Sequence, residues 1–279
     1  MKKINRRSFL AAAGLTAAAL ALTACGGSAS STASSTASSA ASSTSAAAEL
    51  TTVEAGKLTM ATNATFPPYE MTTDSGEIEG IDVDTAKAIA EKLGLELQID
   101  DMDFDAALLS VQQGKADIVM AGVTVTDERK AVMDFSDSYA TGIQSIIVPE
   151  GSDIASPDDL AGKKIGTQRG TTGYIYCSDD FGDENVVAYD DGLTAVQALN
   201  NGQVDAVVID NAPAKEFVAA NPGLVILDTS YAEEDYAIGV AKGNTQLLDA
   251  INGALEELQD DGTVQSIVDK YISADSAAQ

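Results

Sequence analysis

The chain has 279 residues and is strongly acidic, with 43 Asp and Glu residues against 16 Lys and Arg residues and no histidine. Such a charge makes nucleic acid and anionic membrane surfaces poor partners. Without histidine, the chain lacks the commonest general base, the Ser-His and Cys-His nucleophile pairs and the commonest transition-metal ligand. Most hydrolase designs are thereby excluded, and we expect no metal, no cofactor and no catalysis.

The N-terminal segment has the layout of an export signal. Its first 24 residues contain four basic side chains, then an apolar stretch from Leu10 to Leu22, then small residues before Cys25. Leu22-Thr-Ala-Cys25 resembles a bacterial lipobox, in which the cysteine is acylated; an ordinary secretory signal that ends near a cysteine is the alternative. Residues 5–10 also look like a twin-arginine signal, although two adjacent arginines fit any export signal. We expect residues 1–24 to be removed and Cys25 to carry a lipid.

Residues 25–49 are rich in Ser, Thr and Ala and bury too little apolar surface to fold. We expect a flexible tether that averages about 25 Å from end to end. If Cys25 is lipidated, Cys177 has no partner for an internal disulfide. The chain without its signal keeps 12 basic residues against 43 acidic ones, a net charge of −31. Lys and Arg are so scarce that the position of each one needs a local explanation.

From Lys57 onward, short β-rich segments alternate with amphipathic helical ones. In the first half, the apolar spacing predicts a strand, a helix that ends at Gly94, a strand, a helix that ends at Gly114 and a strand. The strands are Leu58–Thr62, Leu95–Ile99 and Asp117–Ala121, and the apolar stripes of the helices are Ala86, Ile89, Ala90 and Leu93, then Phe104, Ala107, Leu108 and Val111.

The second half repeats this scheme, which predicts an α/β fold with mainly parallel sheets. Its strands are expected at Lys164–Thr167, Val186–Tyr189, Val204–Ile209 and Leu224–Leu227. Residues 111–120 and 199–208 share one plan of helix end, Gly, two residues, Asp and a buried strand. This echo indicates two similar lobes, although any joint between a helix and a strand could look alike.

Residues that follow the strands are the candidates for binding, because ligands of α/β sheets bind outside the carboxyl ends of the strands. Thr126 is a predicted N-cap, which places Arg129 in a first helical turn where a cation opposes the helix dipole. Either Asp127 and Glu128 offset this, or Arg129 faces an external anion, which we favour. A guanidinium beside free N–H groups suits a carboxylate, and Asp210, after the echoing strand, could meet an ammonium. Together they describe a site for a zwitterion such as an α-amino acid.

Further candidates lie near these strand ends. Phe66 and Phe104 could contact an aliphatic side chain, with plain core packing as the alternative. Residues 168–173 resemble an anion-cradling turn, which is weak evidence alone. Asp82 and Asp84 could do acid–base or metal work, but we expect Asp82 to cap the helix that begins near Val83 and Asp84 to complement its dipole.

With these residues in place, the chain resembles the family 3 solute-binding proteins, the polar amino-acid receptors of ABC importers. The resemblance extends from Lys57 to Ile272. The matching segments are Thr62–Glu70 (TNATFPPYE), Gly80–Asp84 (GIDVD), Phe104–Ala106, Ala121–Arg129 (AGVTVTDER), Phe135–Asp137, Gly170–Thr171 and Val204–Asp210 (VDAVVID).

The resemblance implies a two-lobed periplasmic-binding-protein fold of type II, with two mainly parallel sheets joined by a two-strand hinge. Lobe one would comprise residues 50–141 and 237–273, lobe two residues 142–236, and residues 274–279 would form a tail. The protein would be a monomer, anchored by its lipid on the extracytoplasmic face of the membrane, where it delivers an amino acid to an ABC permease.

By position in the family motifs, each site residue receives a role. Arg129 would bind the ligand α-carboxylate, helped by the N–H groups of Thr124 and of Thr171 or Thr172. Asp210 and the Gly122 carbonyl would take the ammonium, and Phe66 and Phe104 would sandwich the side chain. The full set of contact residues is Asn63, Phe66, Phe104, Ala121, Gly122, Thr124, Arg129, Gln168, Thr171, Thr172 and Asp210.

Two departures from the family pattern bear on specificity. Relatives that bind cationic or amide side chains often have Asp at the position of Asn63, and glutamine receptors have Lys near Gln168. A neutral or polar side chain other than glutamine is therefore expected. The alternative function is an exported enzyme like cyclohexadienyl dehydratase, which shares the fold; it needs a general acid in the cleft, where this chain offers only carboxylates.

Overall fold

The computed structural model describes residues 50–272. The expected signal, the tether with Cys25 and the C-terminal tail lie outside the described residues. The strands are β1 (Lys57–Thr62), β2 (Thr65–Phe66), β3 (Glu70–Thr72), β4 (Ile78–Glu79), β5 (Glu96–Asp101), β6 (Ile118–Val119), β7 (Met133–Pro149), β8 (Ile165–Gln168), β9 (Val186–Tyr189), β10 (Ala206–Asp210), β11 (Leu224–Ile226) and β12 (Ala232–Ala241). The helices are α1 (Ile81–Leu93), α2 (Phe104–Gln112), α3 (Asp127–Val132), α4 (Thr172–Phe181), α5 (Gly192–Asn200), α6 (Asn211–Ala220), α7 (Thr245–Asp260) and α8 (Thr263–Tyr271), with 3₁₀ turns η1 (Pro157–Leu160) and η2 (Asp183–Asn185).

The main sheet has the strand order β5-β1-β6-β12-β7-β10-β8-β9, with β11 paired to β7. Its two ends are parallel, because β1 pairs with β5 and β6, and β8 pairs with β9 and β10. The fold is thus the expected mixed α/β class with mainly parallel ends. The two expected sheets are continuous, because β7 is 17 residues long and pairs antiparallel with β12, β10 and β11.

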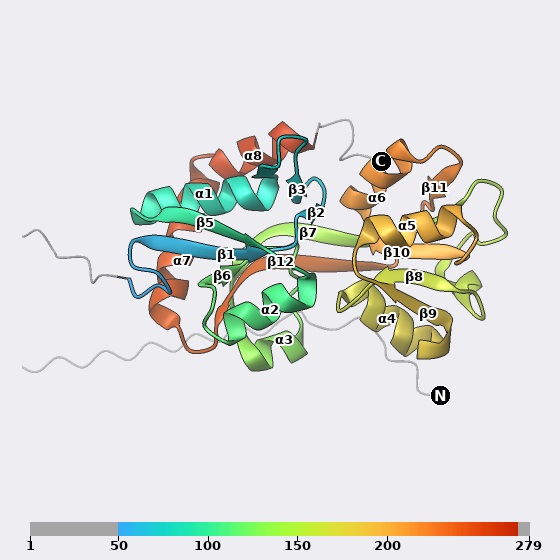
Figure 1. The fold of residues 1–279 in the computed structure, drawn as a ribbon, viewed down its shortest axis with the longest axis horizontal. Helices are drawn as coiled ribbons and strands as arrows, with labels where there is room; N and C mark the ends of the chain where they lie inside the picture. The colour runs from blue at the N-terminus through green and yellow to red at the C-terminus, as the bar shows by residue number, and fades with distance from the viewer. Residues whose placement is uncertain (1–49, 273–279) are drawn as a thin grey trace, which may run out of the picture. The chain divides into compact units, whose positions relative to one another are not determined.

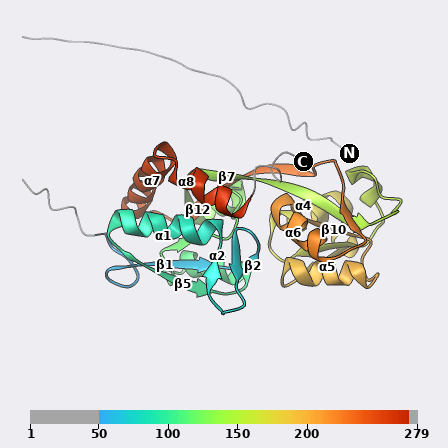
Figure 2. The ribbon, with the colours of Figure 1, turned by 90° about the horizontal axis from the view of Figure 1, so that it is seen from above.

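Figures 1 and 2 both show β7 and β12 as the long strands that connect the two halves of the described region. We call residues 50–141 and 237–272 the first lobe and residues 142–236 the second lobe. The pairing of β12 with β7 shifts register between Tyr236 and Ala237, where β12 passes from one lobe to the other.

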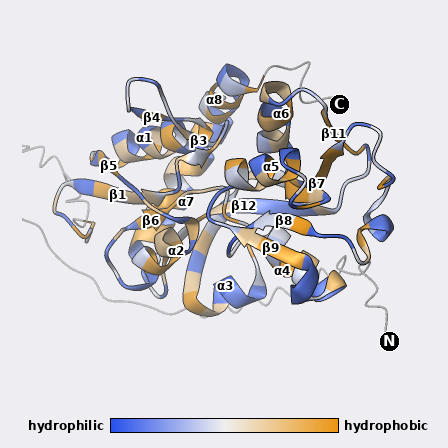
Figure 3. Ribbon diagram, turned by 45° about the vertical axis from the view of Figure 1, so that its right-hand side comes forward, coloured by the Kyte–Doolittle hydropathy of each residue, from blue (hydrophilic) through white to orange (hydrophobic). Residues whose placement is uncertain are grey.

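Each lobe has buried clusters on both faces of its part of the sheet, because successive side chains of a strand point to opposite faces. In β10, Val207 and Ile209 pack with residues of α5 and α6, whereas Ala206 and Val208 pack with Ile165 and its neighbours. In the hydropathy colouring of Figure 3, β9 is largely hydrophobic and α3 is largely hydrophilic. Within residues 50–272, no helix is both long and apolar enough to cross a bilayer.

The predicted helices and strands are present, with ends that differ by at most two residues. Helix α1 is followed by Gly94 in the left-handed conformation, with φ 70°, as its sequence predicts. The small sheet β2-β3-β4 was not predicted, because strands of two or three residues carry no readable alternation.

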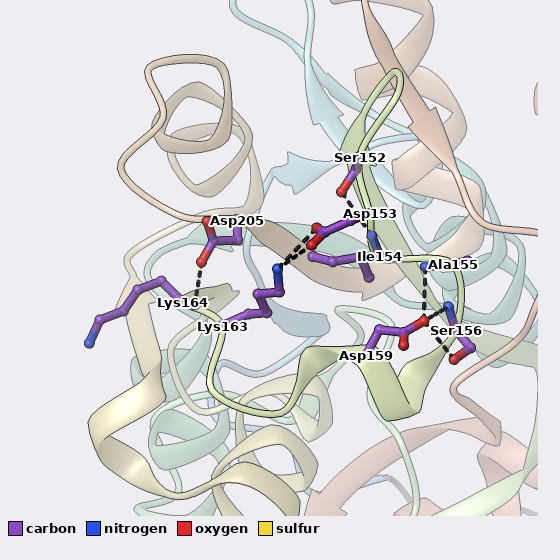
Figure 4. Close-up of polar contacts among 9 residues, drawn as sticks. All are labelled: Ser152, Asp153, Ile154, Ala155, Ser156, Asp159, Lys163, Lys164 and Asp205. Carbon is purple, nitrogen blue, oxygen red and sulfur yellow. Dashed lines mark hydrogen bonds and ion pairs between the residues drawn. The ribbon is translucent and has the colours of Figure 1, made fainter.

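The similar plan of residues 111–120 and 199–208 is confirmed by their backbone conformation and hydrogen bonds. Gly114 and Gly202 both have φ 66°. Asp117 Oδ2 accepts a bond from the N–H of Thr59, and Asp205 Oδ2 accepts one from the N–H of Lys164, so each aspartate ties its joint to a neighbouring parallel strand. Figure 4 shows Asp205 with Lys164, beside the ion pair of Lys163 with Asp153 and the capping box of Ser156 and Asp159.

The expectation that Asp82 caps helix α1 is wrong. The helix begins at Ile81, its N-cap is Gly80, and no side chain caps it. Asp82 is fully buried, and its Oδ2 accepts bonds from the N–H of Gly122 and the hydroxyl of Tyr139. The residue therefore holds the segment after β6 to α1, a tertiary role that local spacing does not reveal.

Candidate functional site

A cavity with about 400 Å³ of space, part of it open to solvent, lies between the lobes, where strands β1, β6, β8 and β10 end. This is the edge at which ligands of α/β sheets bind. The structure brings together on its walls all eleven residues that the sequence proposed as ligand contacts. The remaining lining residues, to which no sequence motif assigned a ligand contact, are Glu70, Gln144, Ile209 and Tyr236.

Arg129 enters the cavity from the first lobe and is 8% exposed. Thr126 is the N-cap of α3 and its hydroxyl accepts the Arg129 N–H, as predicted. The guanidinium donates to the Thr124 carbonyl at 2.8 Å and to the Gly170 carbonyl of the second lobe at 3.2 Å. Its carbon lies 5.3 Å from the ring centroid of Phe104, within the range of a cation–π contact. Two of its five N–H donors are thus used in these bonds, and the others remain for an anion.

Asp210 enters from the second lobe and is 2% exposed. Its Oδ2 accepts the N–H of Ile143 at 2.7 Å, and its Oδ1 accepts the N–H of Ala212 at 3.0 Å as the N-cap of α6. Burial raises the pKa of Asp210 to about 6, although these two N–H groups and the Tyr236 hydroxyl favour the charged form. A cationic group at the cavity would favour ionisation of the same carboxylate.

Gly122 forms the turn that joins Asp82 to the cavity wall. Its φ is +55°, which glycine adopts without strain, and an added Cβ would lie 2.9 Å from Cε1 of Phe66 and 3.2 Å from Cε2 of Tyr236. Phe66 in turn stacks on Tyr69 with ring centroids 5.8 Å apart. Glycine is therefore required here by backbone conformation and by close packing against two rings.

An amide chain connects the lobes at another wall. Asn63 Nδ2 donates to the Met102 carbonyl, which fixes its Oδ1 toward Gln168, and Gln168 Nε2 donates to that oxygen at 2.8 Å and to the Asp190 carbonyl at 3.4 Å. Both amide orientations are set, because each end of the chain meets a carbonyl, which can only accept. Both N–H donors of the Gln168 amide are thus occupied, which leaves its Oε1 as an acceptor.

Glu234 lies on β12 behind the cavity wall and is 7% exposed. Its Oε2 accepts the hydroxyls of Thr124 at 3.1 Å and Thr172 at 2.9 Å, and the Nε2 of Gln144 at 3.0 Å. Burial lowers the pKa of Arg129, and Glu234 is the charge that opposes this most strongly. The charge opposite Arg129 is therefore partly internal, which the sequence argument did not foresee.

Glu70 and Asp82 form a buried carboxyl pair beneath the cavity. Both are fully buried, and burial together with the adjacent Asp82 raises the pKa of Glu70 well above its usual range. Burial also raises the pKa of Asp82 to about 6. Both oxygens of Glu70 and the Oδ1 of Asp82 have no donor among the described residues. A proton on Glu70, shared with Asp82, satisfies this pair, which then carries one negative charge.

Glu234, behind the wall, and Tyr236, which lines the cavity, were not selected from the sequence and carry only a weak signal there. Glu234 and Tyr236 are two residues apart on a strand, so they face the same side, while Glu233 and Asp235 are exposed. The segment Glu233–Ala237 has four polar residues out of five. It therefore shows no hydrophobic alternation that would indicate which of its acids points inward.

Metal and thiol chemistry find no support among residues 50–272. No cluster of three His, Cys, Asp or Glu side chains could hold a metal ion there. Cys177 is buried and free, and burial raises the pKa of its thiol to about 12, which keeps it protonated.

Comparisons with known proteins agree on one family. The model of the bacterial extracellular solute-binding proteins, family 3, matches residues 58–274. The L-cystine-binding protein TcyJ of Escherichia coli (strain K12) is 34% identical over 226 residues, which are 80% of this chain and 85% of TcyJ. A probable histidine-binding protein of Neisseria gonorrhoeae is 33% identical and covers 97% of both chains.

A solved structure extends the likeness to three dimensions. An ancestral arginine-binding protein bound to glutamine is 44% identical and superposes with a TM-score of 0.75, covering 78% of this chain and 98% of that one. The family match, the sequence identities and the shared fold agree, and the chain belongs to the family 3 bacterial extracellular solute-binding proteins.

Proposed function

We propose that the protein is an amino-acid receptor that closes on a zwitterionic α-amino acid and delivers it to an ABC importer. The observation that carries this proposal is that Arg129 and Asp210, from opposite lobes, line one cavity. A guanidinium and a carboxylate placed this way match the two charges that every α-amino acid presents. The relatives named above are amino-acid-binding proteins, which supports the same reading.

The α-carboxylate would be held by the free N–H groups of the Arg129 guanidinium and by two backbone N–H groups. Thr172 is the first residue of α4, where N–H groups have no acceptor within the helix. Thr124 pairs with Tyr236 as an isolated bridge whose bonds are made by Val125 and Ala237, so its own N–H points away from β12. Each group is a donor that suits an anion.

The ammonium would be held by the Asp210 carboxylate and the Gly122 carbonyl. Its side chain would extend between Phe66 and Phe104 toward Asn63 and Gln168. Because both N–H donors of Gln168 are bonded within the protein and its Oε1 can only accept, a polar side chain that donates hydrogen bonds fits best. Closure would bend β7 and β12, the strands shared by both lobes, and would exclude water from the charged groups.

The receptor would be a monomer, lipid-anchored through Cys25 on the extracytoplasmic face of the membrane, with residues 25–49 as its tether. Radiolabelled palmitate would enter the wild-type protein but not Cys25→Ser if this anchoring is right. We propose no catalytic step, because the chain has no histidine; incubation with prephenate or arogenate should give no product.

A thermal-shift screen of the mature protein against the twenty amino acids and cystine tests the function. A ligand at 100 times its dissociation constant stabilises a protein by about 2.7 kcal/mol. At least one amino acid should therefore raise the melting temperature by several degrees in the wild type and not in Asp210→Ala. A screen in which no amino acid shifts the wild type would refute the proposal.

A further inference from the structure

Glu234 lies behind the cavity wall, where hydrogen bonds from both lobes fix its carboxylate. Its Oε2 receives three hydrogen bonds, one each from Thr124 of the first lobe, Thr172 of the second lobe and Gln144 of β7. An ionised carboxylate is the form that suits three donors at one oxygen. Its Oε1 is buried without a donor among the described residues.

The charge of Glu234 is felt at both ends of the proposed zwitterion clamp. It is the foremost charge that stabilises the buried guanidinium of Arg129, and it also opposes ionisation of Asp210. Arg129 is therefore balanced by a resident counter-ion before any ligand carboxylate is counted. A zwitterion adds one positive and one negative charge and leaves that balance unchanged.

The charges of the cavity and the groups behind it are unequal. Arg129 is the cation that lines the cavity, Asp210 and Glu70 line it as well, and Glu234 and Asp82 lie behind its walls. Each uncompensated charge costs more in a partly desolvated site than in water. A ligand with one extra positive charge reduces this excess, and a neutral side chain does not.

Hydrogen-bond polarity favours the same kind of ligand. Thr124 and Thr172 direct their hydroxyl protons at Glu234, so their remaining capacity is to accept. Gln168 likewise offers an acceptor oxygen, because its NH₂ group is bonded to Asn63 and to the Asp190 carbonyl. Side-chain atoms on this part of the wall thus favour a ligand rich in donors.

We propose that Glu234 is a specificity-determining residue which, as the resident counter-ion of Arg129, makes the site prefer an amino acid with one net positive charge. This inference rests on the proposed amino-acid-binding function. It reverses the expectation of a neutral side chain, which depended on position 63 alone. It also assigns Glu234 a positioning role toward the threonine hydroxyls of both lobes.

Calorimetry of the mature protein with L-arginine and L-citrulline tests this, because the two ligands have side chains of equal length and differ by one charge. One charge at roughly 10 Å and an effective dielectric constant of about 20 is worth about a tenfold change in affinity. Wild type should therefore bind arginine at least about tenfold more tightly than citrulline, and Glu234→Gln should lower this ratio about tenfold.

Two variants separate charge from shape. Glu233→Gln removes the same charge from the exposed neighbour on β12 and should leave the ratio unchanged. Glu234→Asp keeps the charge but shortens its reach to the hydroxyls, so both affinities should fall while the ratio persists.

The outcomes distinguish this inference from the proposed function. A wild-type ratio near one, an unchanged ratio in Glu234→Gln, or a ratio lost in Glu234→Asp would each overturn it. So would binding of a different, uncharged amino acid with neither arginine nor citrulline bound, although the receptor function would then stand. The wild-type comparison needs no variant, so it decides even if Glu234→Gln does not fold.

Discussion

Replacing Arg129 by alanine removes the cation to which we assign the ligand carboxylate. The side chain is buried, donates to the Thr124 carbonyl at 2.8 Å and bridges to Gly170 of the second lobe at 3.2 Å. Its loss would leave a bound carboxylate buried and unpaired, next to the negative charge of Glu234. Breaking such a pair costs about 3–5 kcal/mol, and about 1.4 kcal/mol corresponds to a tenfold change in affinity. Binding of the amino acid identified by the screen should therefore weaken at least about a hundredfold.

Isothermal titration calorimetry measures this loss, with circular dichroism to verify folding. Arg129→Lys keeps a charge but lacks the planar fork, so it should recover only part of the affinity. Arg169→Ala is the matched control, because its guanidinium side chain is 57% exposed and its ion pair with Asp190 spans 3.5 Å. An exposed pair of this kind contributes about 0–1 kcal/mol. Retention of wild-type affinity within tenfold by Arg129→Ala, or an equal loss in Arg169→Ala, would refute the reasoning.

Other consequences concern protonation, glycine geometry and the counter-ion. Burial raises the pKa of Asp210 to about 6, so this carboxyl group is protonated at a higher pH than an exposed one. The ligand ammonium needs the charged carboxylate, so affinity should fall as the pH drops below 6. Calorimetry at pH 7.5 and pH 5 should show a loss of about tenfold, since a group with that pKa is about one-tenth ionised at pH 5, and a flat profile would contradict it. Gly122→Ala should lower both the melting temperature and the affinity. Gly94→Ala has a similar φ of +70° and no atom within 4 Å of its added Cβ, so it should lower the melting temperature alone. Equal effects of the two variants on affinity would contradict the role of the Gly122 turn in binding. Glu234→Gln should reduce the preference for arginine over citrulline, as described above.

The sequence predicted those parts of the fold that depend on local pattern. Helix α1 ends just before Gly94 and α3 starts just after Thr126, because a left-handed glycine and a capping hydroxyl act within a few residues. The continuity of β7 was not predicted, because residues 133–149 include three Ser, two Asp and one Gly, and pairing with β12 overrides the weak strand preference of these residues.

The site was predicted where scarcity or position gave a signal. Arg129 stood out because bases are few and because a cation opposes the start of a helix. Glu234 did not, because it is one of many acids and only the register of β12 directs it inward while Glu233 faces solvent. Asp82 was misassigned because its partners, Gly122 and Tyr139, are 40 and 57 residues away in the chain.

The central claim is that one amino acid is held by its carboxylate at Arg129 and by its ammonium at Asp210. A crystal structure of the mature protein with the amino acid selected by the screen tests this most directly. We expect carboxylate oxygens within hydrogen-bonding distance of the guanidinium, and the ammonium within hydrogen-bonding distance of Asp210 and of the Gly122 carbonyl. An amino acid bound outside this cavity, or bound with its two charged groups exchanged, would contradict the account.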